Sequence, residues 1–278
     1  MGETNTSGHT PALPPARDLA GAWLLMAVLA AFAWALTVAQ ARDTGVAPGT
    51  MGMAVPLFLA LWLVMMIAMM VPSVAPVALT WARGITRPST GLARTARTTA
   101  FVGAYLVVWT AFGLVAYGLL ALTGDLVADH PGAGRWIGAA AFALAGLQQL
   151  GPLKNVCLRH CRSPMSQPLT HAGHRPRAHD LRAGAHHGMY CLGCCWGLMI
   201  LLVPLGVMNT AAMAAVAALI FLEKLWRHGP ALSRAAGIAF LVLAVLCVTG
   251  PPQVQDWLLP GLTAPAAPMA PMGMTGAP

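Results

Sequence analysis

The sequence predicts an all-α fold: a polytopic transmembrane helical bundle of about seven helices, with six as the alternative count. The first observation is composition, since 58% of the 278 residues are apolar and only 9% are charged, whereas soluble domains usually carry about 25% charged residues. The second is distribution: the charges cluster between apolar runs, several of which reach the roughly 20 residues that a spanning helix needs. A chain so poor in charge cannot cover a water-facing surface, so we expect no globular soluble domain.

The first half of the chain is expected to hold a tail and four spanning helices. Residues 1–18 are polar and Pro-rich, which is typical of a disordered tail, and a transmembrane domain is expected over 19–249. The first apolar run is longer than the roughly 7–15 residues of a signal-peptide core, so it is interpreted as a retained helix. Pro72 and Pro76 are expected to kink the second helix. The four expected helices span residues 19–39, 54–79, 99–123 and 135–150.

The second half begins with a polar, Cys/His-rich loop, expected over 151–187. The apolar run that follows, residues 188–222, would extend roughly 50 Å as one helix, well beyond a hydrocarbon core of about 30 Å. Because Pro204, Gly206 and Asn209 lie near its middle, we predict a hairpin of two short helices. The three expected helices span 189–205, 209–222 and 231–249, and a Pro/Met-rich C-terminal tail is expected over 250–278.

The distribution of basic residues sets the expected orientation. With seven helices and the N-terminus inside, only Arg42 and Arg135 of the 16 Lys and Arg residues lie outside, in keeping with the positive-inside rule. A single crossing by the long apolar run would move Lys224 and Arg227 outside, so seven helices fit better than six. We therefore expect a multi-pass protein of the cell inner (plasma) membrane, with the loop 151–187 in the cytoplasm.

The net charge of +8 does not indicate a nucleic-acid partner, because the basic residues lie in loops between apolar runs, where they orient helices. The expected partner surface is the lipid bilayer. The sequence contains no G-x4-G-K-[ST] phosphate loop, no H-E-x-x-H helix and no G-x-S-x-G elbow. These features favour a binding protein over an enzyme.

Five of the six cysteines lie in two tight groups that flank the polar loop. The first group has the pattern C-x3-C and the second C-x2-C-C. Thiolates at these spacings suit soft or borderline ions such as Cu(I) or Zn(II). If the second group is helical, Cys191, Cys195 and Met199 share one face, with Cys194 beside Cys191. Two alternatives stay open: cysteines packed as small apolar residues, and a redox-active dithiol. The candidate ligands are Cys157 and Cys161 in the first group, and Cys191, Cys194 and Cys195 in the second.

Histidine is concentrated in the same loop, which holds six of the nine in the chain. Imidazole ligates Zn, Cu and Ni, and His187 is the candidate ligand taken from this group. The alternative is a flexible, solvated loop whose histidines contact no metal. The six are His160, His171, His174, His179, His186 and His187.

Methionine forms two stripes on the second expected helix. Met65 with Met69, and Met66 with Met70, are i, i+4 pairs, so two adjacent rows of thioethers result. Thioethers bind Cu(I) and are poor ligands for hard ions. Methionine is also a common filler of apolar cores, so packing is the alternative interpretation of all four.

Met208 and Asn209 near the expected hairpin complete the candidate ligands, and two charged residues follow them. Met208 adds a thioether and Asn209 an amide, although a buried amide can instead cap a helix end or bridge helices by hydrogen bonds. Glu223 and Lys224 are expected to form a charge pair at the membrane interface. An intramembrane glutamate would instead indicate an ion or proton path.

Four blocks of the sequence carry a family resemblance. They are W-x2-M-M-x-A-M-M-x-P from Trp62 to Pro72, P-L-K-x2-C-L-x2-C-R-x-P from Pro152 to Pro164, H-x-G-x-Y-C-x-G-C-C-W-x-L-M from His186 to Met199, and G-x-M-N-x3-M followed by E-K, from Gly206 to Lys224. In this order they resemble the DUF2182 family of predicted metal-binding integral membrane proteins, over about residues 54–245. Some members of that family are associated with copper delivery to a polyphenol oxidase. The resemblance implies that the five clustered cysteines, the four methionines of the second helix, Met208 and Asn209 are motif residues.

The main hypothesis is a metal-binding integral membrane protein, a Cu(I) chaperone or transfer protein that supplies a cuproenzyme. Its partner would be a copper-dependent oxidase or another copper-handling protein, and zinc is the alternative ion. Cysteine thiolates would capture the ion, and the neutral thioethers would hold it in the membrane without burying carboxylates. Two other functions stay open: a thiol-based membrane oxidoreductase or sensor, and a structural membrane subunit without bound metal.

Overall fold

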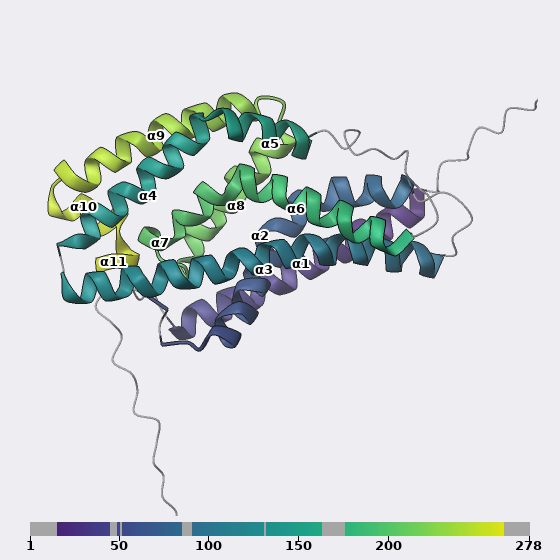
Figure 1. The fold of residues 1–278 in the computed structure, drawn as a ribbon, viewed down its shortest axis with the longest axis horizontal. Helices are drawn as coiled ribbons and strands as arrows, with labels where there is room; N and C mark the ends of the chain where they lie inside the picture. Colours follow the sequence, from purple (N-terminus) through teal and green to yellow (C-terminus); the bar gives the residue numbers. More distant parts are fainter. Residues whose placement is uncertain are drawn as a thin grey trace, which may run out of the picture.

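The fold is entirely helical over the residues that the computed structural model describes, and no strand occurs among them, as the sequence predicted. These residues are 16–44, 49–50, 52–84, 91–130, 132–162 and 176–263. Figure 1 shows their helices: α1 (Ala16–Thr44), α2 (Val55–Gly84), α3 (Gly91–Asp129), α4 (Ala133–Leu150), α5 (Pro152–Arg162), α6 (Pro176–Ile200), α7 (Leu202–Leu205), α8 (Thr210–Leu225), α9 (Gly229–Thr249), α10 (Pro252–Leu258) and α11 (Pro260–Thr263).

Four of these helices are long and apolar enough to cross a membrane. The segments, which lie in α1, α2, α3 and α9, are Leu24–Asp43, Val55–Trp81, Thr95–Asp129 and Gly229–Thr249. The expected count of seven spanning helices is not confirmed. The other three expected spans are helical in α4, α6 and α8, but α8 has only 16 residues, and α4 and α6 carry polar side chains along part of their length.

Large apolar side chains cover the outward faces of α1, α3 and α9. Leu24, Val107 and Val245 are each at least 60% exposed, whereas Met66 and Met70 of α2 are fully buried. Soluble proteins rarely expose large apolar patches to water, but lipid tails solvate them. The three outer helices therefore offer a surface suited to lipid, with α2 inside.

The expected polar loop 151–187 is wrong at its first end, which is helical in α5. This helix is amphipathic, so it packs against α6 and α8 instead of remaining solvated. The residues that it buries are Lys154, Cys157, Leu158 and Cys161.

The other end of the expected loop is also helical, because α6 begins at Pro176 and not at residue 189. Its polar first half is anchored to α3 by an ion pair in which the Arg97 Nε lies 2.7 Å from the Asp180 Oδ2. The two helices also approach closely, since a Cβ on Gly184 would collide with the backbone carbonyl of Phe101. Helix α6 thus lies along α3 as a single rod of 25 residues.

The long apolar run breaks where the sequence predicted. Gly206 has a φ of 89°, a left-handed conformation that favours glycine, directly after the short helix α7. Helix α8 then begins at Thr210. The break creates the α7–α8 turn, which joins α7, in contact with α11, to α8, in contact with α2.

Part of the expected C-terminal tail 250–278 belongs to the fold. Helices α10 and α11 lie within it, and Leu258, Leu259 and Leu262 are buried. Helix α11 packs closely on the α7–α8 turn, where a Cβ on Gly261 would lie 2.5 Å from the Gly206 backbone nitrogen. Residues 264–278 lie outside the described residues.

Candidate metal centre

Three cysteines of α6 bring their thiols together. The Sγ atoms of Cys191, Cys194 and Cys195 all lie within 4.8 Å of one another, and those of Cys194 and Cys195 are 3.2 Å apart. Helical spacing places Cys191 and Cys195 on one face, with Cys194 beside them. All three side chains are at most 1% exposed. The group is therefore a compact, water-excluded cluster of soft donor atoms.

A fourth thiol reaches this cluster from α5. The Cys161 Sγ lies 3.8 Å from the Cys194 Sγ, although the two residues are 33 positions apart in the sequence. The two cysteine groups of the sequence therefore meet in space. Cys157 does not join them in the same way. Its Sγ lies against α6 at Gly193, where a Cβ would come within 2.8 Å of it, and burial raises the pKa of its thiol. The structure thus separates Cys161, within the cluster, from Cys157, beside it.

A lysine and a tyrosine contact the cluster directly. The Lys224 Nζ donates to the Cys191 Sγ at 3.0 Å and to the Ser73 Oγ at 3.1 Å. The Tyr105 hydroxyl lies 3.0 Å from the same sulfur. A buried ammonium group beside a thiol favours its thiolate form, which is the form that binds metals. Side chains of α3 and α8 therefore contact the Cys191 sulfur, and Ser73 of α2 contacts the lysine.

A second buried cation, Lys154 of α5, contacts the backbone of the cluster. The Lys154 Nζ lies 2.5 Å from the Glu223 Oε2 and donates to the Cys194 carbonyl oxygen at 2.7 Å. Gln149 donates from Nε2 to the other Glu223 oxygen at 2.6 Å. Each charge in this network has a partner, as buried charges require. The network ties α4, α5 and α8 to the backbone of the cysteine helix.

The expected charge pair between Glu223 and Lys224 at the membrane interface is wrong. Both side chains are buried, at 1% and 7% exposure, and each has a different partner. Consecutive helix residues point about 100° apart, so Glu223 faces Lys154 while Lys224 faces Cys191.

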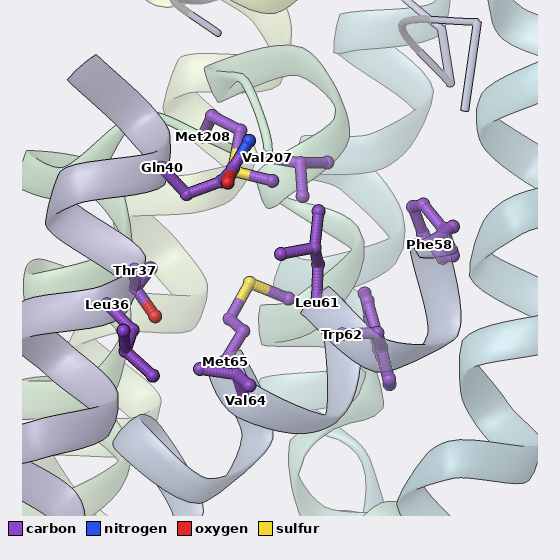
Figure 2. A pocket seen from close by; sticks show the side chains of 10 residues that line it. All are labelled: Leu36, Thr37, Gln40, Phe58, Leu61, Trp62, Val64, Met65, Val207 and Met208. Carbon is purple, nitrogen blue, oxygen red and sulfur yellow. The ribbon is translucent and has the colours of Figure 1, made fainter. Parts of the chain in front are cut away.

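The methionines divide into a core group and a cavity group. Met66, Met69 and Met70 are at most 2% exposed in the central core. Met65 and Met208 line a cavity of about 160 Å³ between α1, α2 and the α7–α8 turn. Figure 2 shows both thioether side chains extending into this space.

Met199 lies between the cysteine cluster and the cavities near the α7–α8 turn along the sequence of α6. It lies two helical turns beyond Cys191 on the same face of α6 and lines a smaller cavity of about 40 Å³. Trp62 and Val207 line both cavities. The sulfur atoms of α6 are thus followed, toward the α7–α8 turn, by two neighbouring voids.

His187 lies one turn before Cys191 on the same helix. It is 2% exposed, packs near the rings of Phe101 and Tyr105, and its Nδ1 has no hydrogen-bond partner among the described residues. Burial lowers the pKa of His187 to about 4, so the imidazole is neutral at pH 7 and able to ligate a cation. His171 and His174 lie outside the described residues.

Comparison with known proteins decides the family. A family model described as PpoB2, copper chaperone, matches residues 59–247. The chain belongs to the PpoB2 copper chaperone family. The matched range contains all the cysteines and helices α3 to α8 whole. No match was found among curated proteins or among solved structures.

One candidate ligand of this PpoB2 family member, Asn209, has a structural role. The Asn209 Oδ1 accepts from the Ala212 N–H at 3.1 Å and its Nδ2 donates to the Leu205 carbonyl at 3.0 Å. Both ends of the amide are therefore used at the start of α8, where asparagine is a preferred N-cap. This is the capping role that the sequence left open.

Sequence reasoning did not find Tyr105, Ser73 and Lys154 as neighbours of the cluster in this PpoB2 family member. Tyr105 and Ser73 belong to helices far from the cysteines in sequence. Lys154 did carry a signal, because it lies within the motif that contains Cys157 and Cys161. A lysine inside a cysteine motif is a feature from which a charged neighbour of the thiols could have been expected.

Proposed function

We propose that the protein is a Cu(I) chaperone or transfer protein of the membrane that supplies a cuproenzyme, and that it acts by binding and not by catalysis. The observation that carries this proposal is the convergence of four buried thiols, those of Cys161, Cys191, Cys194 and Cys195. Membership of the PpoB2 copper chaperone family supports copper as the cargo. The broader DUF2182 resemblance is part of the same proposal.

The donor atoms favour a soft cation. The cluster offers sulfur, and the carboxylate of Glu223, which shares Lys154 with the cluster backbone, is occupied by Lys154 and Gln149. Thiolates and thioethers select Cu(I), whereas carboxylates and carbonyls select hard ions. A borderline ion such as zinc is the alternative cargo.

The balance of buried charge also favours Cu(I). One Cu(I) with two thiolates carries one negative charge, which the Lys224 ammonium balances at Cys191. Zn(II) with all four thiolates would carry two negative charges, one more than Lys224 supplies, since Lys154 is paired with Glu223. Uncompensated buried charge is costly.

The methionines supply a route onward from the thiols. Met199 continues the cysteine face of α6, and Met65 with Met208 lines the cavity beside the α7–α8 turn. Neutral thioethers bind Cu(I) more weakly than thiolates, and a relay needs sites that release the ion. In this proposal the cysteines capture Cu(I) near the cytoplasmic face of the inner membrane, and the thioethers pass it toward a copper-dependent oxidase or another copper-handling protein.

The test is metal analysis of detergent-purified protein loaded with Cu(I). Wild type is expected to retain stoichiometric Cu(I) through desalting, and a variant with Cys191, Cys194 and Cys195 replaced by Ser is expected to lose it. Cys247→Ser is the matched control, because Cys247 is also fully buried but lies in α9. Equal copper retention in the triple variant and wild type would refute the proposal.

One contact supports a second candidate, a thiol-based oxidoreductase or sensor. The Cys161 and Cys194 Sγ atoms, 3.8 Å apart, need only a small shift to reach the roughly 2.05 Å of a disulfide. Metal-free protein with a reversible Cys161–Cys194 disulfide, detected by mass spectrometry of alkylated peptides, would favour this function. If the protein holds neither copper nor a disulfide, a structural membrane subunit would be the remaining function.

A further inference from the structure

Two histidines from different helices meet beside the thiol cluster but outside it. His160 of α5 and His186 of α6 have ring centroids 5.5 Å apart. Tyr190 contacts both, stacking on His160 at 3.9 Å and meeting His186 edge-on at 4.9 Å. The two imidazoles are therefore brought together from separate segments and held by a shared aromatic neighbour.

The spacing of the two rings fits one shared cation. Metal–nitrogen bonds to imidazole are about 2.0 Å long, so two histidines on one ion place their ring centroids about 5–6 Å apart. His186 is exposed and His160 is half-buried, so the pair is accessible from the surface of the molecule. A cation arriving from water would meet these rings before it met any thiol, since all the thiols of the cluster are buried.

The pair is also directly connected to the thiol cluster. His160 precedes Cys161 in the chain, and the ring of His187 lies 6.3 Å from that of His160. Four residues of helix correspond to about 6 Å, so Cys191 lies one turn beyond His187. The unpartnered Nδ1 of buried His187 is a free donor atom between the exposed pair and the sulfur atoms.

We propose that His160 and His186 form an entry site that binds Cu(I) first and passes it, by way of His187, to Cys161 and Cys194. This inference rests on the proposed function and assigns the place where the ion enters. In the transfer, copper–nitrogen bonds break as copper–sulfur bonds form. Copper stays in the +1 state, no electron is exchanged, and each thiol that binds as thiolate releases its proton to bulk water.

The entry site predicts a kinetic effect without loss of capacity. Purified protein is mixed with a limiting amount of Cu(I) held by a chromogenic chelator, and transfer is followed by the change in chelator absorbance. His186→Gln, and His186→Gln combined with His160→Gln, should slow loading on the order of tenfold, equivalent to about 1.4 kcal/mol. Final copper per protein should equal that of wild type, because the thiols are unchanged.

The control is His179→Gln, on the same helix, whose ring stacks on Trp81 at 5.5 Å and not on the pair. It should load at the wild-type rate. His186 is exposed, so its substitution should leave the thermal unfolding temperature unchanged and any rate effect interpretable.

Each outcome bears on the entry site. Wild-type loading rates in both His186 variants would overturn it, and so would a fall in final copper content, which would make the histidines part of the tight site. As a second test, the variant with Cys191, Cys194 and Cys195 replaced by Ser should keep weak Cu(I) binding that His160→Gln with His186→Gln abolishes. A wild type that takes up no copper at all would instead refute the proposed function itself.

Discussion

The two sulfur-bearing regions of the molecule differ in what surrounds the sulfur. The thiol cluster on α6 is buried and contacted by charged or polar groups, with Lys224 at 3.0 Å from a sulfur and Lys154 on the Cys194 carbonyl. None of the described residues that line the cavity with Met65 and Met208 is charged. In the proposed function, the first region would hold Cu(I) on thiolates whose negative charge Lys224 balances. The second region would offer neutral thioethers, which bind the ion more weakly and so release it more easily.

The largest effect is expected on removing the Glu223 carboxylate, which pairs with Lys154 beside the thiol cluster. Glu223→Gln should destabilise the protein by about 3–5 kcal/mol, because it leaves the Lys154 ammonium buried at 0% exposure without a counter-charge. The measurement is thermal unfolding of the metal-free protein in detergent micelles, followed by circular dichroism.

A double variant controls for this effect. Lys154→Met with Glu223→Leu removes both charges and should recover much of the lost stability, since apolar replacement of a whole buried pair is often tolerated. If Glu223→Gln unfolds at the wild-type temperature, the ion pair does not support the thiol region.

The next effect in size concerns affinity. Lys224→Met should weaken Cu(I) binding by about 10–100-fold, the usual consequence of removing a group that supports a metal ligand, because Cys191 loses its balancing charge. Competition titration against a Cu(I) chelator measures the dissociation constant.

Tyr105→Phe separates charge from hydrogen bonding at the same sulfur. It removes the hydroxyl 3.0 Å from the Cys191 Sγ but leaves Lys224 in place, so it should weaken binding less than Lys224→Met does. A larger loss for Tyr105→Phe would show that the ammonium is not the main support of Cys191.

The thiol region also shows how far the sequence could predict the site. The cysteine spacing predicted that Cys191 and Cys195 share a helix face, and this is confirmed, because a helical period of 3.6 residues is local. The meeting of Cys161 with Cys194 could only be hypothesised, since it depends on how α5 packs on α6. The partner of Glu223 lies 69 positions away, and adjacent charges on one helix misled the prediction toward Lys224.

The fold could likewise be predicted from the sequence where it depends on local composition, and not where it depends on packing between helices. Apolar runs predicted the helices and the break near Gly206, since both depend on local composition. The polar segment after α4 was predicted as a loop because its mean composition is polar. Its one-sided burial of Lys154, Cys157 and Cys161 emerges only when a partner helix is present.

The smallest effect is expected at the thioether region, and it should be on release and not on capture. Met65→Leu with Met208→Leu keeps the volume of the cavity wall, so stability should change by less than about 1.5 kcal/mol and Cu(I) content should match wild type. Transfer of Cu(I) from loaded protein to an external acceptor chelator should become slower, because the cavity between α1, α2 and the α7–α8 turn loses both soft donors. Met69→Leu is the matched control, since Met69 is buried in the core and lines neither cavity. If the Met69 variant slows release as much as the double variant does, the thioethers act by packing. The proposal that the cavity lined by Met65 and Met208 releases Cu(I) would then be refuted.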